Sequence, residues 1–158
     1  MTVRERRPGH DAHGLRFVLV AARFNEAYVR RLVDAARDVL VRGGAFESDL
    51  EVWWVPGSFE LPLACKWAAE SGRCDAVLAF GVLIRGETEH FRLVAEACAH
   101  GLTRAALDAS VPVLNGVLAV HDAGQAAARA GGPLGNRGAD VALAAIQMAG
   151  LARERSRA

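Results

Sequence analysis

Hydrophobic positions along the chain follow two alternating patterns. Short, almost uninterrupted apolar runs are typical of strands buried on both faces. They occupy residues 16–22, 50–55, 75–84 and 111–120. The stretches that follow them repeat apolar residues every three or four positions, which predicts amphipathic helices. These run from Asn25 to the Gly43–Gly44 pair and over residues 61–71, 89–109, 123–130 and 139–154. Because strand and helix alternate, we expect a four-stranded parallel sheet with helices on both faces, a three-layer α/β/α sandwich.

Several segment boundaries carry a local signal. The side chain of Asn25 is suited to capping the first helix, and the glycine pair at 43–44 is suited to ending it. The glycine-rich segment 131–138 (GGPLGNRG) has no apolar periodicity and is predicted to be a loop. Residues 1–14 also lack periodicity, so we expect a flexible arm attached to a single domain that spans residues 1–158.

Composition excludes several classes of protein. The 158 residues are 52% hydrophobic and carry a formal net charge of +1, which fills a core but gives no broad attraction for nucleic acid or an anionic membrane. The N-terminal segment lacks the apolar core of a secretory signal, and no apolar run is long enough to span a bilayer. Three cysteines without CxxC spacing are expected to be buried, reduced thiols, and no metal-binding motif is present. We therefore expect a cytoplasmic protein without a metal.

Polar and aromatic residues gather where the predicted strands end. They lie at residues 23–25, 55–62 (VPGSFELP), 85–91 (RGETEHF) and 121–122, and Asn115 lies within the last strand. In open parallel sheets, ligands bind outside the carboxyl ends of the strands. The sequence therefore predicts a ligand site at this edge of the sheet.

The RGETEHF segment is the most informative of these. Gly86 lets a ligand approach the backbone closely, and Thr88 places a hydroxyl just before a helix start. Free amide groups and the positive end of the dipole make a helix N-terminus a natural phosphate seat. His90 falls in the first turn, where a neutral imidazole can accept a proton and return it. The same residues also fit a simple cap at Thr88 and a surface histidine at His90.

Other candidate residues are weaker when taken singly. Arg129 and Arg137 could each bind a phosphate through paired hydrogen bonds, but each also fits a solvated surface charge. Phe24 and Phe59 fall in loops, where a ring can stack on a flat heterocycle, although core packing is an alternative for Phe59. The glycine-rich segment 131–138 is not a P-loop, because no Gly-Lys-Ser/Thr closes it, and no GxGxxG motif follows the first strand.

Five segments together resemble a known family. They are ARFN (22–25), VPGSFELP (55–62), GVLIRGETEHF (81–91), NGVL (115–118) and RAGGPLGNRGAD (129–140). In order and spacing, from about residue 16 to 151, they are similar to the 6,7-dimethyl-8-ribityllumazine synthases, which have a flavodoxin-like sheet. The resemblance implies a transferase that performs the penultimate step of riboflavin biosynthesis. It condenses 5-amino-6-(D-ribitylamino)uracil with 3,4-dihydroxy-2-butanone 4-phosphate, without metal or organic cofactor.

The resemblance also implies roles for individual residues. His90 matches the proton carrier. The pyrimidine and its ribityl chain would be bound by Phe24, Asn25, Ser58, Phe59, Glu60, Val82, Leu83, Ile84 and Asn115. The phosphate substrate would be bound by Gly86, Glu87, Thr88, Arg129 and Arg137. Asn115, Arg137 and Val82 stand where phenylalanine, lysine and threonine are common in the family, and Ala119 and Gly124 also depart from it.

The resemblance also bears on how the chain assembles, and two other functions remain open. The resemblance implies a homopentamer with active sites between subunits, and the short 131–138 segment is similar to members that assemble into an icosahedral capsid of sixty chains. One alternative is a flavodoxin-like module that binds a flavin, pterin or lumazine without turnover. Another is a paralogue that condenses a different pyrimidine amine.

Overall fold

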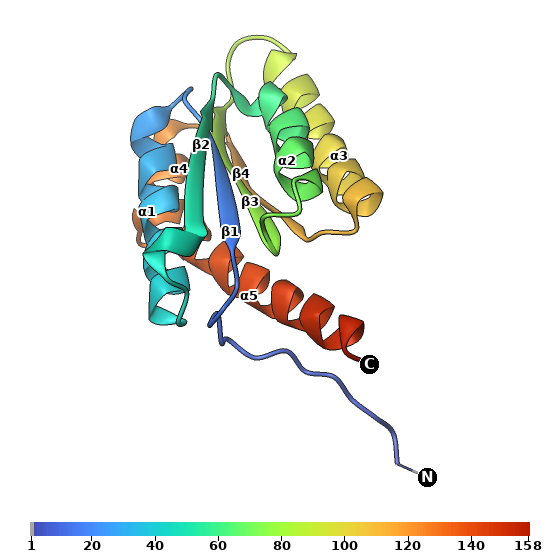
Figure 1. Cartoon of the computed structure of the whole chain (residues 1–158). Helices are drawn as coiled ribbons and strands as arrows, with labels where there is room; N and C mark the ends of the chain where they lie inside the picture. Colours follow the sequence, from blue (N-terminus) through green and yellow to red (C-terminus); the bar gives the residue numbers. More distant parts are fainter. Residues whose placement is uncertain (1) are drawn as a thin grey trace.

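A computed structural model describes residues 2–158 and contains one four-stranded sheet with every strand parallel. Its order is β2-β1-β3-β4, with bounds β1 (Phe17–Ala22), β2 (Leu50–Val55), β3 (Ala76–Ile84) and β4 (Val113–Val120). The predicted strands are confirmed, with starts that differ by two residues at most. The three-layer, flavodoxin-like arrangement is confirmed as well (Figure 1).

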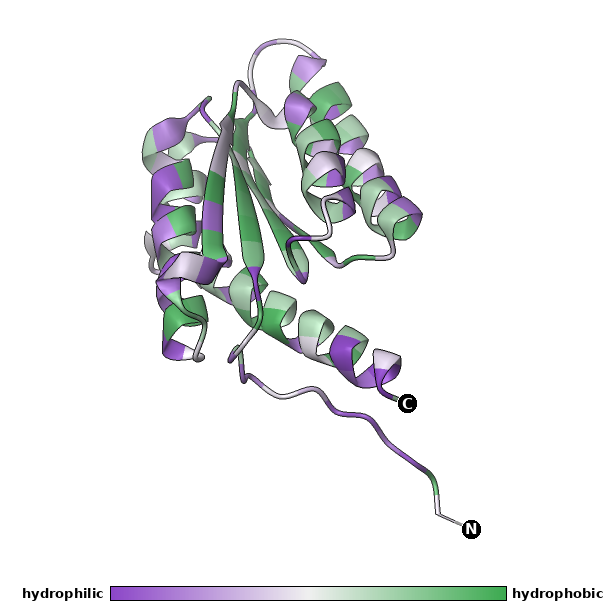
Figure 2. Cartoon of the chain, viewed as in Figure 1, coloured by the Kyte–Doolittle hydropathy of each residue, from purple (hydrophilic) through white to green (hydrophobic). Residues whose placement is uncertain are grey.

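Five helices form the outer layers. They are α1 (Glu26–Arg42), α2 (Leu61–Glu70), α3 (His90–Ala109), α4 (Ala123–Arg129) and α5 (Arg137–Ser156). Two short 3₁₀ helices, η1 (Glu47–Asp49) and η2 (Ser58–Glu60), flank β2. Helices α2 and α3 pack on one face of the sheet, while α1, α4 and α5 pack on the other, each turning its apolar stripe inward (Figures 1 and 2).

Strand β1 divides the two cores because alternate side chains of a strand point to opposite faces. Phe17 and Leu19 pack with α1 and α5, whereas Val18 and Val20 pack with α2 and α3. All six residues of β1 are buried, as expected for a central strand in a parallel sheet. Complete burial of one such leucine or phenylalanine contributes about 1.5–3 kcal/mol, so this strand anchors both layers.

The three cysteines all belong to the core under α2 and α3. Cys65, Cys74 and Cys98 are buried and free, which confirms the prediction of reduced thiols. Burial raises the pKa of both Cys74 and Cys98 to about 11, and burial together with the neighbouring thiols raises the pKa of Cys65 further. The thiols are therefore neutral and serve as small packing groups.

The glycine-rich segment is not the loop that the sequence predicted. It forms a hairpin of β5 (Ala130–Gly132) and β6 (Gly135–Asn136), and α5 begins at Arg137, two residues earlier than expected. The side chain of Asn136 caps α5, accepting from the backbone amides of Gly138 at 2.7 Å and Ala139 at 3.3 Å. Its amide nitrogen also donates to the backbone carbonyl of Arg31, which ties the hairpin to α1.

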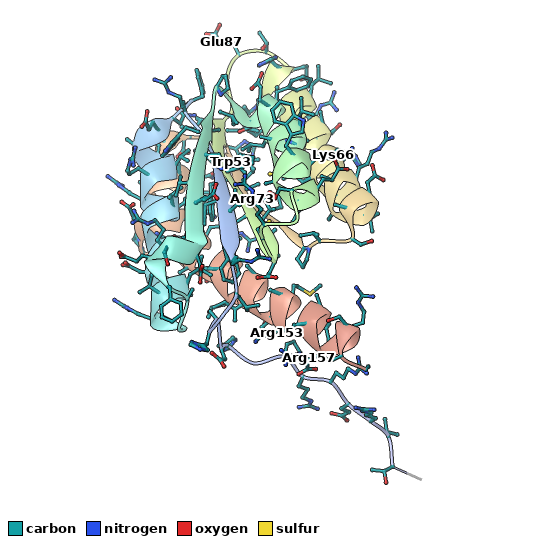
Figure 3. All side chains as sticks on the ribbon, in the orientation of Figure 1. Trp53, Lys66, Arg73, Glu87, Arg153 and Arg157 are labelled. Atoms are coloured by element: carbon teal, nitrogen blue, oxygen red, sulfur yellow. The ribbon has the colours of Figure 1, made fainter. Side chains whose placement is uncertain are left out.

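The predicted arm is also shorter than expected. Residues 2–9 contain no regular secondary structure, but Ala12 is fully buried and donates its amide to the Gly43 carbonyl at 2.8 Å. On α5, Arg153 donates to the His13 carbonyl at 3.1 Å, on the side of the helix that faces the arm (Figure 3). Residues 10–14 therefore pack against α1 and α5. Within residues 2–158, no helix has both the length and the apolar character needed to cross a membrane.

Candidate active site

A cleft of about 870 Å³ opens at the carboxyl ends of the strands, on the face covered by α2 and α3. It brings together residues from the first three predicted clusters. Those that the sequence analysis named are Phe24, Ser58, Phe59, Glu60, Leu83, Ile84, Gly86, Thr88 and His90. The edge rule for parallel sheets thus placed most of the candidate residues around one cavity.

The cleft lies where the chain reverses its direction of travel across the sheet. From β1 the chain crosses to β2 on one side, and it then returns past β1 to β3 and β4. Strand β3 is longer than β1: its pairing with β1 ends at Phe80, and it continues to Ile84. The Leu83–Ile84 end of β3 therefore projects beyond β1 and forms part of the cleft wall.

The loops after β1 and β2 form a second wall. Arg23 and Phe24 donate their amides to the carbonyls of Val55 and Pro56, at 2.8 and 3.2 Å, which holds the two loops together. Phe24 is 70% exposed and Phe59 is 64% exposed, so neither ring is used in the core. The alternative that Phe59 is a core residue is wrong. Two exposed aromatic rings beside a cavity are suited to stacking on a flat ligand.

Ser58 packs closely against β3 at Gly81, a residue without a side chain. Among residues 2–158, Ser58 is the one polar residue buried in the core. Its hydroxyl occupies the space that a β-carbon on Gly81 would need. We predict that Gly81→Ala displaces Ser58 into the cleft and raises the KM of the molecule that binds beside Ser58 by about tenfold. Steady-state kinetics with each substrate varied in turn would measure this. An unchanged KM would contradict this prediction. Gly72→Ala is not a suitable control, because the positive φ of Gly72 would strain an alanine there.

The loop between β3 and α3 presents His90 and a helix N-terminus. Helix α3 begins at His90, one residue later than predicted, and the Thr88 hydroxyl accepts a long 3.4 Å bond from the His90 amide. His90 and Thr88 are exposed and line the cleft. The first amides of a long helix and the positive end of its dipole thus face the cavity beside an imidazole. Glu87 lies at the outer end of this loop and does not line the cleft (Figure 3).

Six predicted site residues do not reach this cleft within one chain: Asn25, Val82, Glu87, Asn115, Arg129 and Arg137. Within one chain the imidazole of His90 and the two arginines therefore do not come together, and the expectation of a site between subunits stays a prediction. The reason is the position of the arginines in the fold. Arg129 ends α4 on the opposite face of the sheet, and Arg137 is the exposed first residue of α5. Arg129 donates to the Gln125 carbonyl of its own helix at 3.2 Å.

Asn25, Val82 and Asn115 are engaged elsewhere. The side chain of Asn25 does not cap α1; its amide nitrogen donates to the Val82 carbonyl at 2.7 Å. Val82 is 1% exposed and packs in the core on the opposite face, so its replacement of threonine does not alter the cleft lining. Asn115 accepts from the Val117 amide at 3.0 Å on the outer strand β4.

Sequence analysis missed part of the lining. Pro56, Gly57 and Phe91 lie in predicted strand-end segments but received no individual role, and three further residues of α3 lie outside those segments. Those three are Leu93, Val94 and Ala97. Positions 90, 93, 94 and 97 share one face of a helix, so helical spacing from His90 was the signal that could have found most of them. They give the cleft an apolar wall.

Among residues 2–158, no group of three His, Cys, Asp or Glu side chains is placed to hold a metal ion. The cleft itself presents an imidazole, a hydroxyl, a carboxylate at Glu60 and backbone amides. A cavity with these groups, at the reversal point of a flavodoxin-like sheet, defines an α/β enzyme for small molecules with an aromatic part.

Comparison with known proteins gives the family. The model of the 6,7-dimethyl-8-ribityllumazine synthase family matches residues 14–153. A 6,7-dimethyl-8-ribityllumazine synthase of Halorhodospira halophila is 51% identical over 139 residues, covering 88% of this chain and 89% of the relative. One of Chlorobium phaeobacteroides is 46% identical over 144 residues, covering 91% and 93%. The chain belongs to the 6,7-dimethyl-8-ribityllumazine synthase family, which confirms the resemblance.

Proposed function

We propose that this protein condenses 5-amino-6-(D-ribitylamino)uracil with 3,4-dihydroxy-2-butanone 4-phosphate to give 6,7-dimethyl-8-ribityllumazine, phosphate and water. This transferase reaction is the penultimate step of riboflavin biosynthesis. One observation carries the proposal: His90 lines a cleft that has exposed aromatic rings on one side and a helix N-terminus on the other. Mixing both substrates with the protein should produce lumazine absorbance.

The pyrimidine substrate is assigned to the wall formed by β3 and the loops after β1 and β2. The ring stacks on Phe24, and the projecting peptide groups of Leu83 and Ile84 offer hydrogen bonds to its polar edge. The ribityl chain carries hydroxyl groups, which suit the Ser58 hydroxyl and the Glu60 carboxylate. Binding both parts on preformed walls holds the reactive amine in register with its partner.

The phosphate substrate is assigned to the start of α3. Its dianion is stabilised by the loop and helix amides around Gly86 and Thr88. Imine formation between the amine and the ketone releases water, elimination releases phosphate, and ring closure releases a second water. Each step moves a proton, and His90, which lines the same cavity, is placed to take it up and return it.

A second copy of the chain is proposed to supply the missing cations. Arg129 and Arg137 belong to the α4–α5 side, away from the cleft, so a neighbouring subunit must present them if they bind the phosphate. Helix α2 exposes Leu63 by 54% and Trp67 by 61% beside the cleft face, an apolar surface that suits a partner. A head-to-tail contact of this kind closes into a ring, here a homopentamer, with sites between subunits. Asn115 would be donated in the same way.

Mixed assemblies test the shared site. We predict that His90→Ala and Arg129→Ala, each inactive alone at low phosphate substrate, regain about one quarter of wild-type activity when co-expressed, because a quarter of the interfaces pair two intact residues. Native mass spectrometry would verify mixing and would distinguish a pentamer from an icosahedral assembly. Mixed assemblies without recovered activity would contradict a shared site, and each homogeneous variant is the control.

The activity assay also separates the competing functions. Tight lumazine binding without turnover would favour a binding module, and turnover only with another pyrimidine amine would favour a paralogue. We also propose that residues 1–158 form a single lumazine-synthase-like domain, which is supported by the packing of all five helices on one four-stranded sheet. The proposed location is cytoplasmic. The proposal invokes no metal or organic cofactor.

A further inference from the structure

Asn25 holds an unusual backbone conformation beside the cleft. Its φ of 59° and ψ of 39° lie in the left-handed region, where only one other non-glycine residue of the described chain, Ser110, is found. Such a conformation costs free energy for any residue with a β-carbon, and asparagine tolerates it better than most. Strained residues of this kind persist where the surrounding structure requires them, often at functional sites.

The surroundings of Asn25 show what the conformation achieves. After β1 ends, Arg23 and Phe24 turn towards β2 and bond to Val55 and Pro56. This turn leaves β3 without a strand partner beyond Phe80 on the β1 side. The amide nitrogen of Asn25 donates to the Val82 carbonyl at 2.7 Å and so bridges the gap between the two diverging segments.

Asn25 thus connects three parts of the site. Its carbonyl accepts from the amides of Tyr28 and Val29 to start α1, its side chain reaches β3, and Phe24, the residue before it, lines the cleft. Asn25 itself does not line the cleft. Glycine would adopt this backbone more easily but has no side chain to donate a bond, so the bond to Val82 is what asparagine adds at this position.

We propose that Asn25 is a positioning residue: its bond to Val82 fixes the Phe24 ring as a rigid wall for the pyrimidine. The inference deepens the proposed function and rests on it. It replaces direct contact, the role that the resemblance implies for Asn25, with an indirect role through Phe24. The consequence is specific, because loss of the bond should affect the substrate that stacks on Phe24 and spare the phosphate substrate.

Two substitutions isolate the bond from the backbone. Asn25→Gly relieves the left-handed strain but removes the donor, whereas Asn25→Asp keeps the shape and places a carboxylate against the Val82 carbonyl. We expect both to raise the KM for the pyrimidine about tenfold, the value of one hydrogen bond, with the KM for the phosphate substrate unchanged. Ser110→Gly, the other left-handed position and remote from the cleft, should leave both KM values at wild type.

A double-mutant cycle tests the route through Phe24. In a Phe24→Ala background, Asn25→Gly should cause no further rise in the pyrimidine KM, because the ring that it positions is gone. Fully additive effects, an equal rise for both substrates or an unchanged KM in Asn25→Gly would each overturn the inference. Wild type assayed alongside separates this outcome from failure of the proposed function, since only the latter abolishes lumazine formation in the unmodified protein.

Discussion

Replacing His90 with alanine is expected to lower kcat about a hundredfold or more, because each step of the condensation moves a proton and general acid–base help of this kind contributes about 10²–10⁴. His90 lines the cleft at the first position of α3, and its side chain is exposed, so its removal creates no core cavity. Both KM values should change little, since the imidazole acts on the reacting atoms. Steady-state kinetics and a thermal melt on the same sample measure the two effects separately.

The matched control for His90 lies on the same helix. His100 is also exposed on α3 but does not line the cleft, so His100→Ala should retain wild-type kcat and thermal stability. Wild-type turnover in His90→Ala would remove the imidazole from the mechanism. An exposed side chain has little core packing to lose, so the melting temperature of His90→Ala should stay at the wild-type value. A fall in kcat together with a clearly lowered melting temperature would instead assign His90 a structural role.

The sheet was predictable because its strands are buried on both faces. The residues of β1 and β3 form short, continuous apolar runs bounded by polar residues, whereas the helices show periodic polar positions. The β5–β6 hairpin was not predictable, since its glycine-rich segment carries no periodic signal. Its position depends on Asn136, whose side chain caps α5 and bonds to the Arg31 carbonyl 105 residues away in the chain.

The sequence predicted that the site lies at the carboxyl edge of the sheet, but it did not predict every residue that lines the cleft. Strand ends carry the sequence signal, and Phe24, Ser58 and His90 do meet there. Which helices lie on which face depends on the strand order, and a single sequence does not specify that order. The sequence pattern therefore could not show that Arg129, which the resemblance assigns to the same site as His90, lies with α4 on the opposite face of the sheet. Asn25 was interpreted as a helix cap because the gap that it bridges exists only once β1 and β3 are paired.

The largest stability effect is expected at the crossing of α1 and α5, where Gly138→Ala should destabilise the fold by about 1–3 kcal/mol or more. A β-carbon on Gly138 would collide with the backbone carbonyl of Leu32 on α1. Backbone atoms inside a helix have no rotamer that relieves such a collision, so the two helices must separate. Their separation would loosen the hydrophobic core to which Leu32, Val141 and Ala145 belong.

The same helix supplies the control for this prediction. Gly150 also lies in α5, and a β-carbon there would meet no atom within 4 Å, so Gly150→Ala should stabilise the protein by up to about 1 kcal/mol through helix propensity. Urea unfolding of both variants would measure the opposite signs. Loss of soluble Gly138→Ala protein alongside soluble Gly150→Ala agrees with the prediction. Equal stabilisation of both variants would mean that α1 and α5 cross at a wider separation than described, and that propensity, rather than close packing, decides the effect at residue 138.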